Sequence, residues 1–252
     1  MNIDAKGIYY KELNEMIHQA VSEGQKEIVL QNVNGQRYIA DGLSGDIRII
    51  IHGTPGNDMA AFMDGPVLEI FGNAQDGIGN TMNAGKILVH GNAGDIAGHS
   101  MRGGKIFIQG NVGYRVGIHM KAYQDLFPVI VVGGCAQDLL REYMAGGLII
   151  VLGLNSDASP LGSLDEGRPI VGNYCGTGMH GGAMYIRGQV KDFQLGKEVK
   201  VFELDEKDHK NLENYLGEYT RNFSLDFGKI IEEKFYKLIP YTHRPYGKLY
   251  AY

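Results

Sequence analysis

The chain has 252 residues, of which 44% are hydrophobic and 37 are glycine, and its formal net charge is −5. This length can form one large core with appendages, and the negative charge argues against nucleic-acid binding. No apolar run approaches the roughly 18 residues that span a membrane, and the N-terminus lacks the basic and then apolar pattern of a signal peptide. We therefore expect a soluble, cytoplasmic protein that binds neither nucleic acid nor membranes.

Residues 1–34 predict a helix followed by a strand. The helix would stop near Gly24, and residues 27–33 have the composition of a strand. At the end of a larger sheet, this segment would cap an unpaired strand edge that otherwise invites aggregation. The residues in helical spacing are Leu13, Met16, Ile17, Ala20 and Val21.

Residues 35–190 contain a 19-residue repeat. Short aliphatic runs end in glycine at this spacing, a methionine precedes them in phase, and asparagine follows the glycine at Asn73, Asn92 and Asn111. A repeat of this length is too short for a strand, a crossover helix and a return, but it can form one coil of a parallel β-helix. The glycines are Gly53, Gly72, Gly91, Gly110, Gly134, Gly153 and Gly188, and the methionines are Met63, Met82, Met101, Met144 and Met179.

We accordingly predict an all-β fold, a single-stranded right-handed parallel β-helix of about seven coils with short helical segments at both termini. Each coil would hold two or three short strands. Alternate residues of the runs would form an aliphatic lumen. These lumen residues are Ile49, Ile51, Leu68, Ile70, Ile87, Val89, Ile106, Ile108, Ile130, Val132, Ile149, Val151, Met184 and Ile186.

The opposite phase of the strands is also apolar, with Glu69 as its one charged member. An outer face this apolar cannot meet water along its whole length, so a terminal segment of the chain or a partner must cover it. The apolar members are Ile50, Leu88, Phe107, Val131, Ile150 and Tyr185.

Residues 191–252 predict a helical extension. A strand-like stretch leads to Asp205, which is a candidate N-cap of a helix. Ser224 is a candidate cap for a second helix that runs to Ile239. These helices could cover the outer face of the coils or dock on another subunit. The first helix would present Leu212, Tyr215, Leu216 and Tyr219 on one face.

Two patterns invite a nucleotide or zinc site, and both have structural explanations. Residues 176–181 match the dinucleotide-binding string G-x-G-x-x-G, but they lead into a strand, whereas that mechanism needs a helix. His52 and His90 occupy the same repeat position two coils apart. They would lie about 9.6 Å apart by strand spacing, too far to share one zinc ion.

A ladder of acidic and amide side chains invites a calcium site. Asp76 and Asp95 are neighbours in this ladder, with Asn57 and Asp138 at equivalent positions. Stacked carboxylates can hold calcium, but they more often accept hydrogen bonds from N–H groups in turns. We favour the turn interpretation.

The two cysteines, Cys135 and Cys175, are too few for a disulfide framework or a zinc site. Each lies beside a glycine, where backbone N–H groups could form an anion nest. No sequence pattern places a histidine and an acid beside either thiol, so we favour small packed residues. We therefore predict no catalytic, cofactor-binding or metal-binding residue in this chain.

The coil from Gly94 to Gly110 reads Gly-Asp-Ile-Ala-Gly-His-Ser-Met-Arg-Gly-Gly-Lys-Ile-Phe-Ile-Gln-Gly. It resembles the GXGXG-motif repeat of the C-terminal β-helix domain of the glutamate synthase large subunit, and related repeats occur in one of the subunits of formylmethanofuran dehydrogenase. The resemblance covers roughly residues 35–190. It implies a β-helix that is not catalytic, beside an amidotransferase domain and a barrel domain that carries FMN and an iron–sulfur cluster.

Some microbes encode these domains as separate chains, and a free-standing chain of this size fits that arrangement. The resemblance therefore implies a structural subunit of a split glutamate synthase-type complex, active in glutamate biosynthesis and ammonia assimilation. Its partners would be amidotransferase and flavin-barrel chains, or further copies of itself, and it would hold no cofactor. Two alternatives stay open: a subunit of a formylmethanofuran dehydrogenase-like oxidoreductase, and a free-standing hydrolase with a site near loop 154–171.

Overall fold

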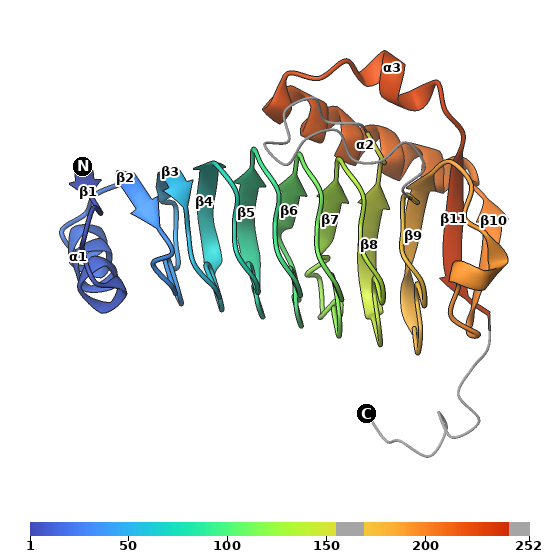
Figure 1. Cartoon of the computed structure of the whole chain (residues 1–252), viewed down its shortest axis with the longest axis horizontal. Coiled ribbons are helices and arrows are strands. Elements are labelled where there is room, and N and C mark those ends of the chain that lie inside the picture. Colours follow the sequence, from blue (N-terminus) through green and yellow to red (C-terminus); the bar gives the residue numbers. More distant parts are fainter. Residues whose placement is uncertain (155–168, 242–252) are drawn as a thin grey trace.

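The strands of the protein stack into one elongated solenoid (Figure 1). The computed structural model describes residues 1–154 and 169–241, which form an eleven-stranded sheet in the order β1-β2-β3-β4-β5-β6-β7-β8-β9-β11-β10. The strands are β1 (Asn2–Asp4), β2 (Glu27–Asn34), β3 (Arg48–Thr54), β4 (Asp64–Phe71), β5 (Ala84–Val89), β6 (Lys105–Ile108), β7 (Val129–Val132), β8 (Ala145–Val151), β9 (Gly181–Arg187), β10 (Val199–Glu203) and β11 (Phe235–Pro240). The helices are α1 (Tyr10–Ser22), the short 3-10 helix η1 (Asp192–Gln194), α2 (Glu206–Phe223) and α3 (Phe227–Ile231).

The repeat sets the register of the parallel strands β3 to β9. Ile49 pairs with Leu68, and Leu68 pairs with Ile87, so equivalent repeat positions are neighbours in adjacent strands. The parallel β-solenoid is thereby confirmed. It has about six turns, one fewer than expected, because the seven strands β3 to β9 are separated by six turns. In the described ranges a turn holds one strand and at most isolated bridges, such as that between Ala74 and Ala93, so our expectation of two or three strands per coil is wrong.

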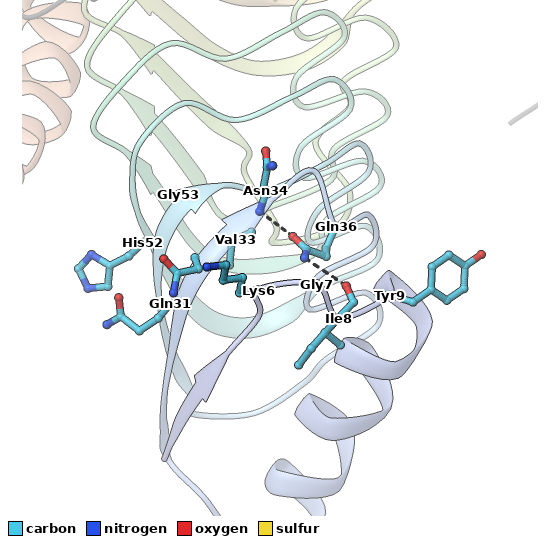
Figure 2. Close-up of a pocket in the computed structure, with 11 residues that line it drawn as sticks. Lys6, Gly7, Ile8, Tyr9, Gln31, Val33, Asn34, Gln36, His52 and Gly53 are labelled. Atoms are coloured by element: carbon cyan, nitrogen blue, oxygen red, sulfur yellow. Dashed lines mark hydrogen bonds between the residues drawn. The ribbon is translucent and has the colours of Figure 1, made fainter.

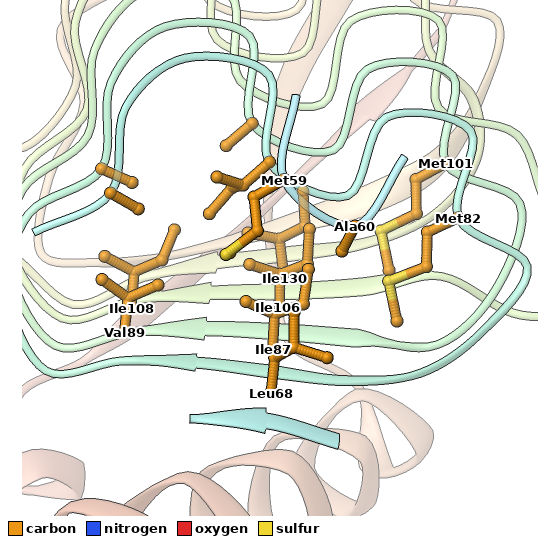
Figure 3. Close-up of a cluster of buried hydrophobic side chains, with 14 of the residues drawn as sticks. Met59, Ala60, Leu68, Met82, Ile87, Val89, Met101, Ile106, Ile108 and Ile130 are labelled. Atoms are coloured by element: carbon orange, nitrogen blue, oxygen red, sulfur yellow. The ribbon is translucent and has the colours of Figure 1, made fainter. Parts of the chain in front are cut away.

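The predicted lumen residues are all fully buried and stack in columns across the turns. Figure 3 shows Leu68, Ile87, Ile106 and Ile130 in one such column, with Met82 and other methionines facing it. Met120 is also fully buried and extends the methionine series. The sequence series omits it because the insertion before β7 separates Met120 from its strand.

The wall opposite the strands is built from left-handed residues at every second position. In the turn that contains Gly79, residues 77, 79 and 81 have φ angles of 72°, 66° and 55°. A Cβ on Gly79 would lie 2.6 Å from Cδ1 of Ile106, so the middle position of this turn must stay glycine. The same alternation recurs in the other turns, at residues 38, 40 and 42, 58, 60 and 62, 96, 98 and 100, 115, 117 and 119, 139, 141 and 143, and 174, 176 and 178.

The outer face of β5 to β9 is covered by α2 of the same chain (Figure 1). Tyr219 packs edge-on against Phe107, with ring centroids 5.8 Å apart, and its hydroxyl donates to the carbonyl of Ile108 at 3.2 Å. Lys105 Nζ lies 2.5 Å from Glu218 Oε2 at the helix edge. The apolar outer residues predicted at Leu88, Phe107, Val131, Ile150 and Tyr185 are buried by this cover.

The two ends of the solenoid are closed by different segments. Helix α1 ends at Ser22, as predicted near Gly24, and buries Leu13 and Ile17 in the lumen core. At the other end, β11 pairs antiparallel with β9 and β10, so the helix expected to run from Ser224 to Ile239 is wrong. Ser224 instead ends α2 in a left-handed conformation.

Candidate functional site

Asn73, Asn92 and Asn111 form the predicted ladder along the solenoid. The N–H of Asn92 donates to Oδ1 of Asn73 at 2.8 Å, and the N–H of Asn111 donates to Oδ1 of Asn92 at 2.8 Å. The N–H of Cys135 continues the series by donating to Oδ1 of Asn111 at 2.7 Å. The amides are therefore engaged in joining one turn to the next.

The carboxylate ladder has the same structural use. Oδ1 of Asp76 accepts from the N–H of Asp95 at 2.8 Å, and Oδ1 of Asp95 accepts from the N–H of Tyr114 at 2.9 Å. Oδ1 of Asp138 accepts from the N–H of Asn173 at 2.7 Å. The fourth member, Asn57, accepts at its backbone carbonyl from the N–H of Tyr38 at 3.1 Å.

These contacts confirm the turn interpretation. Across residues 1–154 and 169–241, no group of three or more histidine, cysteine, aspartate or glutamate side chains could hold a metal ion. In the same ranges, no helix is long and apolar enough to cross a membrane.

His52 and His90 lie on either side of Phe71 in one aromatic stack. The ring centroids of His52 and Phe71 are 5.2 Å apart and those of Phe71 and His90 are 4.5 Å apart. His90 Nε2 also lies 3.1 Å from Oε1 of Glu69, and Phe223 at the end of α2 packs edge-on against the His90 ring. The histidines are therefore side chains at strand ends, separated by a phenylalanine as predicted.

The segment that matches the dinucleotide string has the conformation of a solenoid turn. Gly176 and Gly178 have φ angles of 76° and 67° at two of the alternating left-handed positions, and strand β9 begins at Gly181. A helix N-terminus that could bind a pyrophosphate does not follow the string.

Cys175 faces the lumen beside a buried cation that the sequence does not reveal. Its Sγ lies 3.6 Å from Sδ of Met184, and burial raises the pKa of the thiol to about 12. At neutral pH it is therefore a thiol, which is a poor nucleophile. Cys135, the other candidate, is partly buried at the end of the asparagine ladder.

The buried cation is Arg141, which is fully buried at a left-handed position that other turns fill with glycine or alanine. Its Nη2 donates to the carbonyls of Gly181 at 3.2 Å and Gly147 at 3.5 Å, and its Nε donates to Sδ of Met144. Nη1 has no hydrogen-bond partner. Burial lowers the pKa of the guanidinium to about 9, so Arg141 is still a cation at neutral pH.

A groove of about 920 Å³ lies at the N-terminal end of the solenoid (Figure 2). It is lined by residues 6–9, which precede α1, and by residues of β2 and β3, with Lys6 as a charged member. Gln36 joins two segments that line the groove. Its Nε2 donates to the carbonyl of Ile8 at 3.2 Å, and its Oε1 accepts from the N–H of Asn34 at 2.7 Å. The lining includes His52 but no serine, cysteine or carboxylate that could act with it as a nucleophile–base pair.

The family described as GXGXG motif matches residues 11–243. The chain belongs to this family. It is the family of the glutamate synthase C-terminal domain, which confirms that part of the predicted resemblance, whereas the link to formylmethanofuran dehydrogenase stays a prediction. A relative from Methanocaldococcus jannaschii, named "Uncharacterized protein MJ1350", is 51% identical over 255 residues, which cover 99% of this chain and 95% of the relative.

In this GXGXG-motif protein, sequence reasoning missed two features of the lumen. The alternating left-handed wall leaves a partial signal in the sequence, because two turns have glycines at spacing two, at Gly77 and Gly79 and at Gly176 and Gly178. In other turns, aspartate, phenylalanine or arginine stands at these positions, so the glycine pattern is not visible there. Arg141 gives no such signal, since one arginine in a turn reads as a solvated side chain.

Proposed function

We propose that this GXGXG-motif protein is a non-catalytic assembly subunit of a split glutamate synthase-type complex in the cytoplasm. Its partners would be an amidotransferase chain and a flavin-barrel chain. The observation that carries the proposal is the family match across residues 11–243, which includes the solenoid and both flanking segments.

The chemistry of the described residues supports a role without catalysis. The side chains that could have formed a site are engaged structurally: Asn92 and Asp95 join turns, and Cys175 is a buried thiol. The chain has two cysteines, whereas an iron–sulfur cluster is usually held by four, so the cluster would belong to a partner chain. FMN would belong to the flavin-barrel chain, as the resemblance implies.

The physical role would be to hold catalytic chains in a fixed relation. Adjacent turns are joined by strand hydrogen bonds, by two side-chain ladders and by a continuous aliphatic core. A solenoid joined in this way resists bending, so chains bound at separate places on it keep their distance.

The test is co-expression of the tagged chain with the amidotransferase and flavin-barrel chains encoded by the same organism. We expect the three to elute together in gel filtration at near-equal stoichiometry. A tagged chain that elutes alone, while the other two chains associate with each other, would contradict the proposal.

A further inference from the structure

The cover provided by α2 stops before the sheet does. The middle outward row of the sheet runs through Val29, Ile50, Glu69 and Leu88, which are paired from β2 to β5. Helix α2 buries this row from Leu88 onward, and Figure 1 shows that it extends over β5 to β9. We call the uncovered outward residues of β2 to β4 the open face; they are Glu27, Val29, Gln31, Arg48, Ile50, His52, Val67, Glu69 and Phe71.

The open face differs from the neighbouring outer face of β5 to β9, which α2 buries. The open face is apolar enough to pack: Val29, Ile50 and Val67 are half-buried, and Phe71 is 44% exposed. Phe71 also joins the open face to the covered one. It stacks on His90, which in turn meets Phe223 at the end of α2.

The central charge of the open face is already prepared for burial. Oε2 of Glu69 lies 2.8 Å from Nη2 of Arg48, and Oε1 lies 3.1 Å from Nε2 of His90. A carboxylate tolerates burial only when it is paired and hydrogen-bonded, and Glu69 has both partners in place. Glu27 at the rim differs, because its side chain is 58% exposed and its contact with Arg48 is 3.9 Å long.

Helix α2 shows what kind of element fits this surface. Leu216 and Tyr219 form an apolar stripe that packs on the middle row of the sheet. Glu218 forms ion pairs with two lysines at one edge of the sheet, Lys86 and Lys105. On the open face the same edge row holds Arg48, which pairs with Glu69, and Glu27, which is exposed and incompletely paired. The part of a second helix that meets Glu27 would therefore be basic.

We propose that the open face binds an amphipathic helix of one of the catalytic partner chains, aligned end to end with α2 and carrying an apolar stripe and a lysine or arginine flank. The inference rests on the proposed function and names the surface through which the complex forms. The stripe would lie on Val29, Ile50 and Phe71, and the basic flank would meet Glu27.

The test compares two exposed phenylalanines. Phe71→Arg places a cation in the open face, and Phe62→Arg makes the same change at a residue that is 60% exposed on the opposite wall of the solenoid. Ile50→Arg is a second disruptive variant, and Ile50→Thr is a milder one that keeps a β-branched side chain. Circular dichroism and melting temperature identify variants that fold.

Binding of each folded variant to the purified partner chains is then measured. The inference predicts at least a tenfold weaker affinity for Phe71→Arg and Ile50→Arg, and wild-type affinity for Phe62→Arg. Hydrogen exchange in the complex should show new protection in β2 to β4. Equal binding by all variants would overturn the inference and leave the proposed function standing.

Two further outcomes count against the assignment in different ways. A wild-type chain that binds neither partner overturns the proposed function and this inference together. A wild-type dimer in sedimentation that Ile50→Arg converts to a monomer would assign the open face to a second copy of the chain and overturn the assignment to a partner helix.

Discussion

Truncation of one lumen side chain tests the packing on which the solenoid depends. Ile106 is fully buried between Ile87 and Ile130 in adjacent strands, and its Cδ1 presses against Gly79 on the opposite wall. Replacement by alanine would leave a cavity that the neighbours cannot fill, because their positions are fixed by the strand register. Such changes cost about 2 to 5 kcal/mol, and we expect Ile106→Ala near the middle of that range, about 3 kcal/mol.

The assay is thermal unfolding followed by circular dichroism. For a chain of this length, about 3 kcal/mol corresponds to a fall in melting temperature of roughly 6 to 12 °C. The control is Ile231→Ala, at a residue that is 44% exposed, where we expect less than about 0.5 kcal/mol. Equal effects for the two variants would refute the lumen packing described above.

Three further predictions concern buried polar groups. Arg141→Met removes a buried cation with one unpaired donor, so we expect an unchanged or higher melting temperature at pH 7. A loss of stability above about 2 kcal/mol would show that the hydrogen bonds of Arg141 to backbone carbonyls outweigh the cost of burying its charge. Tyr185→Phe removes the 2.7 Å hydrogen bond from the hydroxyl to the buried carboxylate of Asp208, which should cost about 1 to 3 kcal/mol and speed hydrogen exchange in α2; unchanged exchange would contradict this role. Burial raises the pKa of Asp41 from 3.8 to about 6, so the folded state binds the proton more tightly and the free energy of unfolding should fall as pH rises from about 4 to 6. In denaturant titrations, Asp41→Asn should reduce this dependence of stability on pH. An unchanged dependence would exclude Asp41 as its source.

The solenoid could be predicted from the sequence because two periods agree. Alternation within a strand places Ile87 and Val89 on one side, and the repeat places the same pattern in each neighbouring strand. The hydrogen-bonding asparagines could be predicted for the same reason, since a stacked repeat brings Asn73 next to Asn92.

The parts that sequence reasoning missed depend on tertiary contacts. Residues 235–240 form β11 because β9 offers a sheet edge, although the sequence pattern favoured a continuing helix. The apolar face of α2 can be recognised in the sequence from the helical spacing of its apolar residues. That spacing does not determine whether the helix packs on its own chain or on another. The environment of Arg141 depends on the carbonyls of Gly147 and Gly181, which lie in different turns. The candidate loop at residues 154–171 lies largely outside the described residues, because residues 155–168 are not described.

We propose that this chain organises a synthase without performing its chemistry. The most direct measurement is glutamine-dependent glutamate formation by fixed amounts of the amidotransferase and flavin-barrel chains, titrated with this chain. We predict that turnover rises with added chain and saturates at one equivalent, and that the chain alone has no activity. Full turnover by the two catalytic chains without it, unchanged by its addition, would contradict the proposed function.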